Sequence, residues 1–353
     1  MNILSKRFSL RKYFKFILFI ISCFIISTFI YGCDGDTGPA GPAGADGASP
    51  TVIVPDDYED IQEAIDDLRG DGGSVFIRAG LYMLTQGIHI NKSNVSLSGE
   101  QGTILKLGDE VQQPVILIGT DAEIPIERIS YIEIENIEID GNDENQTSEI
   151  DPDKIWIRNN AIDVRMVDYL WISNVNLHDA RSGALVVSWD SHYVFIDDSS
   201  FHNCFFDGIA LYDSSDIQVS NFLCYENNSA GLSLDNQLEN VIFDGGIIMY
   251  NNDVGIFARN SQDLSFHDLM IFSNDSHGCF LSHETPGTST GVTRLFFDSC
   301  SFLDNDGWGL WLASTTADSP NNAVIGCLFS GNVSGAINVD PGGSLDQEGN
   351  IFQ

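Results

Sequence analysis

Basic residues are scarce in this chain. Its 353 residues include 16 Lys and Arg against 51 Asp and Glu, which gives a formal net charge of −35 at pH 7. This composition excludes nucleic-acid binding through phosphate contacts, because such contacts require Lys and Arg. It also predicts repulsion of polyanionic substrates unless cations bridge the two surfaces. The alternative is that the acidity only keeps the protein soluble in salty water.

Cysteine patterns typical of zinc or disulfide proteins are also lacking. Five of the seven cysteines lie beyond residue 200, at spacings that match neither pattern: Cys204, Cys224, Cys279, Cys300 and Cys327. They stand among apolar residues, where a free cysteine behaves as a small hydrophobic residue. We therefore predict that they belong to the core. We find no zinc-ligand spacing, phosphate-binding loop or Ser-His-Asp arrangement.

The sequence contains a single long apolar run, at residues 16–31. Five basic residues precede this run, and it ends at Ile30-Tyr31-Gly32-Cys33, which resembles the lipobox of bacterial lipoproteins. Such a pattern is typical of a secretory signal. We predict that residues 1–32 are removed, that Cys33 is lipidated, and that a lipid anchor holds the body in the bacterial cell envelope outside the cytoplasm. Which membrane holds it stays open. The alternative is an uncleaved anchor helix, although the run is short for a bilayer span.

Glycine is regularly spaced directly after this run. Residues 35–49 form five Gly-X-Y triplets, and glycine at every third position is the requirement of a collagen triple helix. Residues 33–50 are therefore expected to form a collagen-like linker that begins with the lipidated cysteine. This linker either supports a homotrimer or acts as an extended spacer.

A repeat of about two dozen residues dominates the rest of the chain. A glycine followed by a short apolar strand recurs at Gly183, Gly208, Gly231, Gly255, Gly278, Gly309 and Gly335. Four of these glycines have an asparagine four residues before them, which suits a repeated turn. Residues 57–68 have the apolar spacing of a helix that caps the first coil. Residues 51–353 are thus predicted to form an all-β domain, a right-handed parallel β-helix of three-strand coils with a short N-terminal capping helix.

Parts of this repeat resemble a known superfamily. Residues 58–65, 73–77, 95–99 and 139–146 are similar to segments of pectate-lyase-like β-helix proteins, and the last segment is similar to mannuronan C5-epimerase modules. The resemblance implies a polysaccharide-binding β-helix. The catalytic motif of the epimerases does not transfer, since the chain reads Ser182-Gly183-Ala184-Leu185-Val186-Val187 where they carry Tyr-Gly-Phe-Asp-Pro-His. The signatures of pectate lyases and polygalacturonases are absent as well.

Strand alternation selects the candidate site residues. The second and fourth residues after each repeat glycine should point outward, because side chains alternate along a strand. Catalytic candidates at or beside the fourth position are Tyr212, Asp235, Arg259 and His283, and substrate-binding candidates at the second position are Phe257, Phe280 and Trp311. A base, an acid and a cation are what a lyase or epimerase needs.

Structural explanations of the same residues stay open. Asp235 and Arg259 could form a simple cross-strand charge pair, and the aromatic rings could lie under a long loop. His277 and His283 could be ordinary turn residues. We predict no metal site among these candidate residues. Elsewhere in the chain, Asp140, Asn142 and Asp143 offer oxygen ligands that suit Ca²⁺.

The sequence predicts a lipid-anchored, extracytoplasmic β-helix that binds polysaccharide. Whether it also processes the polysaccharide, as a lyase, an epimerase or a glycoside hydrolase, is left open because β-helix enzymes use unrelated site layouts. The alternative is a non-catalytic structural or adhesion spike that trimerises through the collagen-like stalk.

Overall fold

A computed structural model describes residues 51–282, 291–313 and 321–353. The fold given below is that of these described residues, which belong to one compact unit. The predicted signal at residues 1–32, Cys33, the collagen-like linker and His283 lie outside the described residues. Within the described ranges, no helix has the length and apolar character needed to cross a membrane.

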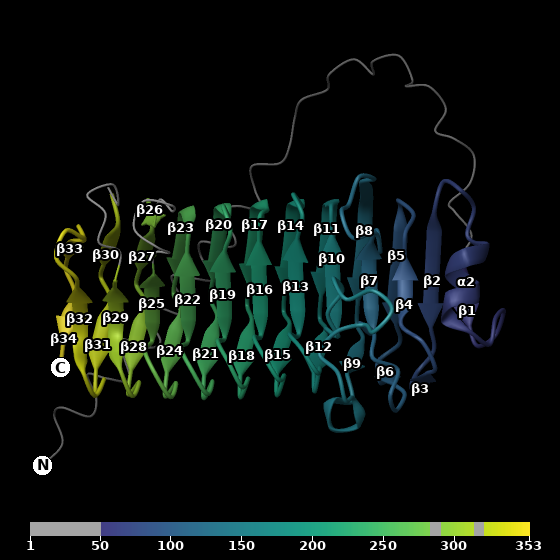
Figure 1. Cartoon of the computed structure of the whole chain (residues 1–353), viewed down its shortest axis with the longest axis horizontal. Helices are drawn as coiled ribbons and strands as arrows, with labels where there is room; N and C mark the ends of the chain where they lie inside the picture. The colour runs from purple at the N-terminus through teal and green to yellow at the C-terminus, as the bar shows by residue number, and fades with distance from the viewer. Residues whose placement is uncertain (1–50, 283–290, 314–320) are drawn as a thin grey trace, which may run out of the picture. The chain divides into compact units, whose positions relative to one another are not determined.

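The described strands form three parallel sheets, and successive coils lie side by side in chain order (Figure 1). The 13-stranded sheet contains β1 (Thr51–Val54), β2 (Gly73–Ile77), β5 (Val95–Gly99), β8 (Ile129–Glu135), β11 (Val167–Ser173), β14 (His192–Asp197), β17 (Ser215–Ser220), β20 (Glu239–Asp244), β23 (Ser261–His267), β26 (Val292–Thr293), β27 (Phe296–Asp298), β30 (Ala323–Ile325) and β33 (Asp346–Glu348).

The other two sheets complete each coil. The 10-stranded sheet contains β4 (Ile88–Ile90), β7 (Ile116–Gly119), β10 (Ile162–Arg165), β13 (Leu185–Ser188), β16 (Ile209–Tyr212), β19 (Leu232–Asp235), β22 (Ile256–Arg259), β25 (Cys279–Ser282), β29 (Trp308–Leu312) and β32 (Gly335–Val339). The 11-stranded sheet contains β3 (Gly80–Leu84), β6 (Thr103–Leu107), β9 (Glu138–Asp140), β12 (Asn176–His178), β15 (Ser200–His202), β18 (Leu223–Tyr225), β21 (Ile247–Met249), β24 (Met270–Phe272), β28 (Ser301–Leu303), β31 (Leu328–Ser330) and β34 (Ile351–Phe352). This arrangement confirms the predicted parallel β-helix of three-strand coils.

The capping helix is shorter than predicted. It is α2 (Ile61–Asp67), and its first turn is capped by Asp60, whose carboxylate accepts a hydrogen bond from the Glu63 amide at 3.0 Å. Ile61 and Ile65 are buried and cover the apolar end of the first coil. A single-turn 3₁₀ helix, η1 (Asp143–Asn145), is the other helical element in the described residues.

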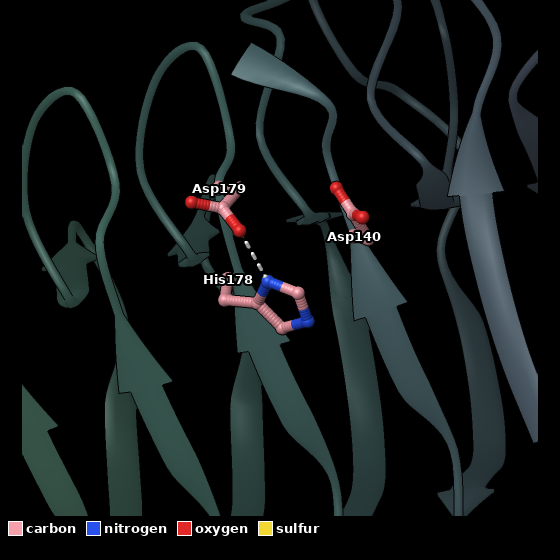
Figure 2. Close-up of side chains that lie close together, drawn as sticks. All are labelled: Asp140, His178 and Asp179. Carbon is pink, nitrogen blue, oxygen red and sulfur yellow. Dashed lines mark hydrogen bonds and ion pairs between the residues drawn. The ribbon is translucent and has the colours of Figure 1, made fainter. Parts of the chain in front are cut away.

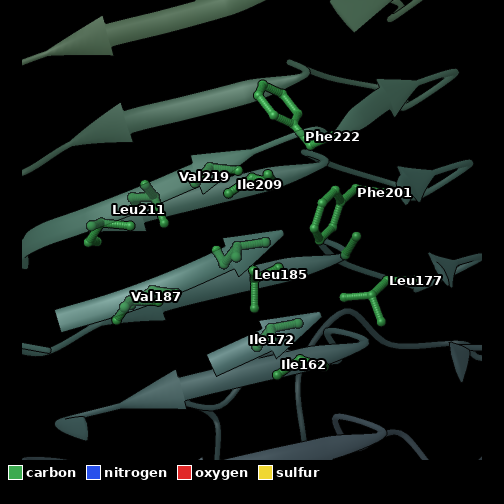
Figure 3. Close-up of a cluster of buried hydrophobic side chains, with 14 of the residues drawn as sticks. Ile162, Ile172, Leu177, Leu185, Val187, Phe201, Ile209, Leu211, Val219 and Phe222 are labelled. Carbon is green, nitrogen blue, oxygen red and sulfur yellow. The ribbon is translucent and has the colours of Figure 1, made fainter. Parts of the chain in front are cut away.

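Inward side chains form apolar ladders that fill the space between the three sheets. Ile162, Leu185 and Ile209 (Figure 3) are in register on neighbouring strands, the ladder continues to Leu232, and all four are fully buried. One coil cannot bury such side chains alone, so each depends on the coils on both sides. The five cysteines of the described residues are free and buried, which confirms that they belong to the core.

Buried asparagines join consecutive coils at one turn. The Asn251 amide donates to Oδ1 of Asn274 at 2.9 Å, and Oδ1 of Asn251 accepts from the Asn227 amide at 3.0 Å. The Asn274 amide continues the ladder to Oδ1 of Asn305 at 2.9 Å. The asparagine period of the sequence therefore reflects a continuous hydrogen-bonded column, in which these buried polar groups find partners.

Candidate functional site

A long groove follows the outer face of the 10-stranded sheet. It consists of three adjoining hollows with volumes of about 470, 160 and 420 Å³. Tyr212 and Arg158 line both the first and the second hollow, and Asp207 lines both the second and the third. The three hollows therefore make one continuous surface, which we call the long groove.

The outward ladder predicted from strand alternation forms much of its floor. Residues in register along it are Asp163, Val186, Ala210, Ser233, Phe257, Phe280 and Trp311. The small side chains of Ala210 and Ser233 occupy the middle of this ladder, between Asp163 at one end and the aromatic residues at the other.

Aromatic side chains gather at both ends of the groove. At one end, the Phe280 ring lies 6.2 Å from the Phe257 ring and 5.0 Å from the Trp311 ring, measured between centroids. The structure therefore brings together all three predicted substrate-binding residues. At the other end, Trp156 and Trp189 line the first hollow and are partly exposed.

The predicted catalytic column of Tyr212, Asp235 and Arg259 occupies neighbouring coils, but it is not an open face. Tyr212 and Asp235 are in register on β16 and β19. Asp235 is only 4% exposed, and its Oδ2 accepts a hydrogen bond from Nε of Arg259 at 2.9 Å. Its Oδ1 accepts one from the Asn236 amide at 2.7 Å. Both carboxylate oxygens are thus engaged, as in the cross-strand charge pair.

Tyr212 has a different environment, because it faces the groove. Its hydroxyl lies 3.3 Å from the hydroxyl of Ser233, which belongs to the outward ladder of the next coil. Burial, followed by the nearby Asp207 carboxylate, raises the pKa of Tyr212 to about 12. The phenol therefore stays protonated at neutral pH and can donate a hydrogen bond to a ligand.

Sequence reasoning missed a buried acid, Asp163, and a buried cation, Arg165, on β10. Asp163 is 5% exposed, and burial raises its pKa to about 6 against the opposing charge of Arg165. Arg165 is 2% exposed, and its guanidinium lies 5.6 Å from the Trp189 ring centroid and donates to the Thr120 carbonyl at 3.1 Å. Strand alternation could have found both, since Asp163 and Arg165 occupy the outward positions of Ile162–Arg165.

Asp207 is the second carboxyl group that sequence reasoning missed, because it precedes the repeat glycine Gly208 and does not lie on the strand that follows it. Burial raises its pKa, against a contact with Ser229 and a 3.0 Å hydrogen bond from the Ala230 amide. His277 lines the same hollow, and burial lowers its pKa. Its Nδ1 accepts a 2.8 Å hydrogen bond from the Trp308 amide, which assigns the ring proton to Nε2. The long groove thus presents acids, phenol and imidazole to one ligand.

A second cluster lies on the 11-stranded sheet, at the ends of β9 and β12. Asp140, His178 and Asp179 offer ligand atoms that all lie within 4.8 Å of one another (Figure 2). The Nδ1 atom of His178 lies 2.7 Å from Oδ2 of Asp179, and its Nε2 atom lies 3.3 Å from Oε1 of Glu138. Oδ2 of Asp140 forms an ion pair with Lys106.

Of the three oxygen ligands that the sequence offers to Ca²⁺, Asp140 belongs to this cluster, whereas Asn142 and Asp143 lie outside it. The Asn142 amide donates to the Leu107 carbonyl at 2.9 Å, and Asp143 accepts from Arg181 at 3.1 Å. Those two side chains therefore serve local contacts, whereas Asp140 lies beside the histidine of the next coil. Sequence reasoning missed His178 because its neighbour Asp140 is one coil away in the chain.

Comparisons with solved structures agree with the fold. An open reading frame product of Geobacillus virus E2, ORF18, matches with a TM-score of 0.64 and 16% identity, over 85% of this chain and 60% of that one. The A-module of mannuronan C-5 epimerase AlgE4 from Azotobacter vinelandii matches with a TM-score of 0.53 and 18% identity, over 84% and 93%. Pectate lyase Pel9A matches with a TM-score of 0.55 and 11% identity, over 82% and 73%. At these identities the likeness shows a shared fold alone.

Sequence comparisons add one family. No curated protein is significantly similar to the chain. A family model described as periplasmic copper-binding protein (NosD) matches residues 135–348, which is more than half of the chain.

Proposed function

Because the chain belongs to the NosD family of periplasmic copper-binding proteins, we propose that it acts outside the cytoplasm, where its long groove binds a polysaccharide strand. The observation that carries this proposal is the continuity of the groove across seven coils, with aromatic rings at both ends and polar groups between them. Seven strands at ~4.8 Å spacing give a groove of about 29 Å, which is long enough for several sugar rings.

The side chains of the groove suit a sugar chemically. Phe257, Phe280 and Trp311 offer apolar rings against which the apolar faces of sugars can pack. Tyr212 and Nε2 of His277 offer hydrogen-bond donors to sugar hydroxyls. A ligand without this combination of apolar faces and hydroxyl groups would leave one of the two sets unused.

Charge indicates which polysaccharides fit. The carboxyl groups of Asp163 and Asp207 line the groove, and the chain as a whole carries a net charge of −35. A strongly anionic glycan would be repelled along its whole length. We therefore expect a neutral or weakly charged glycan.

Hydrolysis in the same groove is a second candidate function, favoured by Asp163. A carboxyl group with a pKa of about 6 keeps its proton to near-neutral pH and can donate it to a glycosidic oxygen. Hydrolysis also needs a second carboxylate on the other side of the bond, and Asp207 is the candidate for it. Asp235 is less suited, because Arg259 and the Asn236 amide engage its oxygens.

The membrane attachment is part of the proposal too. Lipidation of Cys33 would tether the β-helix to a membrane, and the linker at residues 33–50 would act as a spacer or as the stalk of a trimer. The mass of the mature chain tests lipidation, and sizing the protein with and without residues 34–49 tests trimerisation.

Affinity electrophoresis of the full-length chain over a panel of polysaccharides tests glycan binding. Trp311→Ala should weaken binding to the preferred glycan at least tenfold, because the indole forms one end of the groove. Trp171→Ala is the matched control, since Trp171 is a partly exposed tryptophan on the 13-stranded sheet, and it should change affinity less than twofold. Equal effects of the two substitutions, or no retardation by any glycan, would overturn the proposal. Release of reducing ends, and its loss in Asp163→Asn, tests hydrolysis.

A further inference from the structure

The cluster of Asp140, His178 and Asp179 has a donor set that can be compared with copper chemistry. It combines one imidazole nitrogen with two carboxylate oxygens, all within 4.8 Å (Figure 2). Imidazole suits copper and zinc, and Cu²⁺ accepts mixed nitrogen and oxygen ligands more tightly than other divalent ions of its row. The cluster therefore fits Cu²⁺.

The donor set does not fit Cu⁺, which prefers thiolate and thioether ligands. The described cysteines are buried among core side chains, and burial raises the pKa of the Cys204 thiol to about 12. A thiol that stays protonated is not a ligand. The cluster of Asp140, His178 and Asp179 does not suit Ca²⁺ either, because that ion takes six to eight oxygen ligands.

Family membership supplies an independent reason to expect copper on this chain, since the matched model spans residues 135–348 and so includes all three side chains. The fold also supports the site. Asp140 and His178 are in register on β9 and β12, so the backbone pairing of two coils fixes their separation. We propose that Asp140, His178 and Asp179 bind Cu²⁺ through the imidazole and the two carboxylates.

Two neighbours determine how tightly this site can bind. Glu138 lies 3.3 Å from Nε2 of His178, the position of a carboxylate that orients a metal-binding imidazole. Lys106 forms an ion pair with the carboxylate of Asp140 and therefore competes with a cation for that ligand. Glu138 thus supports the site, whereas Lys106 opposes it.

These opposite roles distinguish a specific Cu²⁺ site from nonspecific cation binding by an acidic surface. Cu²⁺ is titrated calorimetrically into the full-length chain in the presence of excess Ca²⁺, and the loaded protein is examined by electron paramagnetic resonance. We expect one Cu²⁺ per chain at this site, with coupling to an imidazole nitrogen. His178→Asn should weaken binding at least tenfold and remove that coupling, and Glu138→Gln should weaken binding about tenfold. Lys106→Met should tighten it.

His267→Asn is the matched control. His267 has a carboxylate 3.9 Å from its Nδ1, that of Asp298, and belongs to no three-ligand cluster within the described residues. Its substitution should leave Cu²⁺ affinity within twofold. Circular dichroism confirms that each variant is folded. Unchanged affinity in folded His178→Asn, or weaker binding in Lys106→Met, would overturn the proposal without bearing on the groove.

Discussion

Arg259 covers Asp235 from the next coil, and its Nε donates to Oδ2 of that carboxylate at 2.9 Å. The pair joins β19 to β22, and Asp235 is 4% exposed. Side-chain alternation predicted that these two residues are vertical neighbours. The sequence left open whether the two residues form a charge pair or a catalytic column, and the engagement of both Asp235 oxygens favours the charge pair.

Asp235→Ala should therefore destabilise the fold. The substitution removes a buried carboxylate that accepts hydrogen bonds from Nε of Arg259 and from the Asn236 amide. Hydrogen bonds to a charged group contribute about 1.5–3 kcal/mol each, so we expect a loss of about 3 kcal/mol of unfolding free energy. Urea denaturation measures this loss. Asp275→Asn is the control, because Asp275 is exposed, and it should change stability by less than about 0.5 kcal/mol. Stability within that limit in Asp235→Ala would contradict the buried ion pair.

The asparagine ladder predicts a loss of similar size at a residue remote from the groove. Asn251 is fully buried, and its side chain bonds Asn227 below and Asn274 above. Asn251→Ala leaves polar groups of both neighbours unsatisfied, at about 1–3 kcal/mol for each. The neighbouring Asn252 is exposed, and its side-chain amide donates to Oδ1 of Asn228 at 3.0 Å, so Asn252→Ala should cost much less. Thermal unfolding compares the two, and equal losses would refute the role of the ladder.

Asp163 predicts a pH dependence of stability. Burial raises its pKa from 3.8 to about 6, so between these values the unfolded chain has released a proton that the folded chain still holds. Stability contributed by the neutral acid is complete below pH 3.8 and is lost as the pH rises through about 6. The loss amounts to about 3 kcal/mol by pH 7.

Asp163→Asn removes this titration while it keeps the shape of the neutral acid. Urea denaturation at pH 4 and at pH 7 measures the stability that each protein loses between the two pH values. Asp163→Asn should lose about 3 kcal/mol less than the unsubstituted chain. An identical pH profile in the two proteins would show that Asp163 ionises normally, and it would remove the support for proton donation.

Much of the fold could be predicted from the sequence, because a solenoid repeats one local solution. Gly208, Gly231 and Gly255 mark equivalent points of successive coils, and the asparagines four residues earlier mark the turn that the ladder occupies. Once these positions were aligned, strand alternation placed Phe257, Phe280 and Trp311 on one face.

The rest of the candidate site depends on parts where the repeat is interrupted. Trp156 and Arg158 come from a long connection between β9 and β10, which no period places in space. His178 meets Asp140 across coils of unequal length, so equal spacing could not align them. Burial decides the chemistry of Asp163, and Asn160 of this same connection donates a hydrogen bond to its carboxylate at 3.2 Å.

Glycan binding in the long groove is tested most directly by a crystal structure of the chain with an oligosaccharide of its preferred glycan. We predict that sugar rings lie along the long groove, against Phe280 and Trp311 and within hydrogen-bond distance of Tyr212. Sugar bound instead on the exposed stack of Tyr131, Tyr169 and Tyr193 on the 13-stranded sheet, with the groove vacant at saturating ligand, would contradict it.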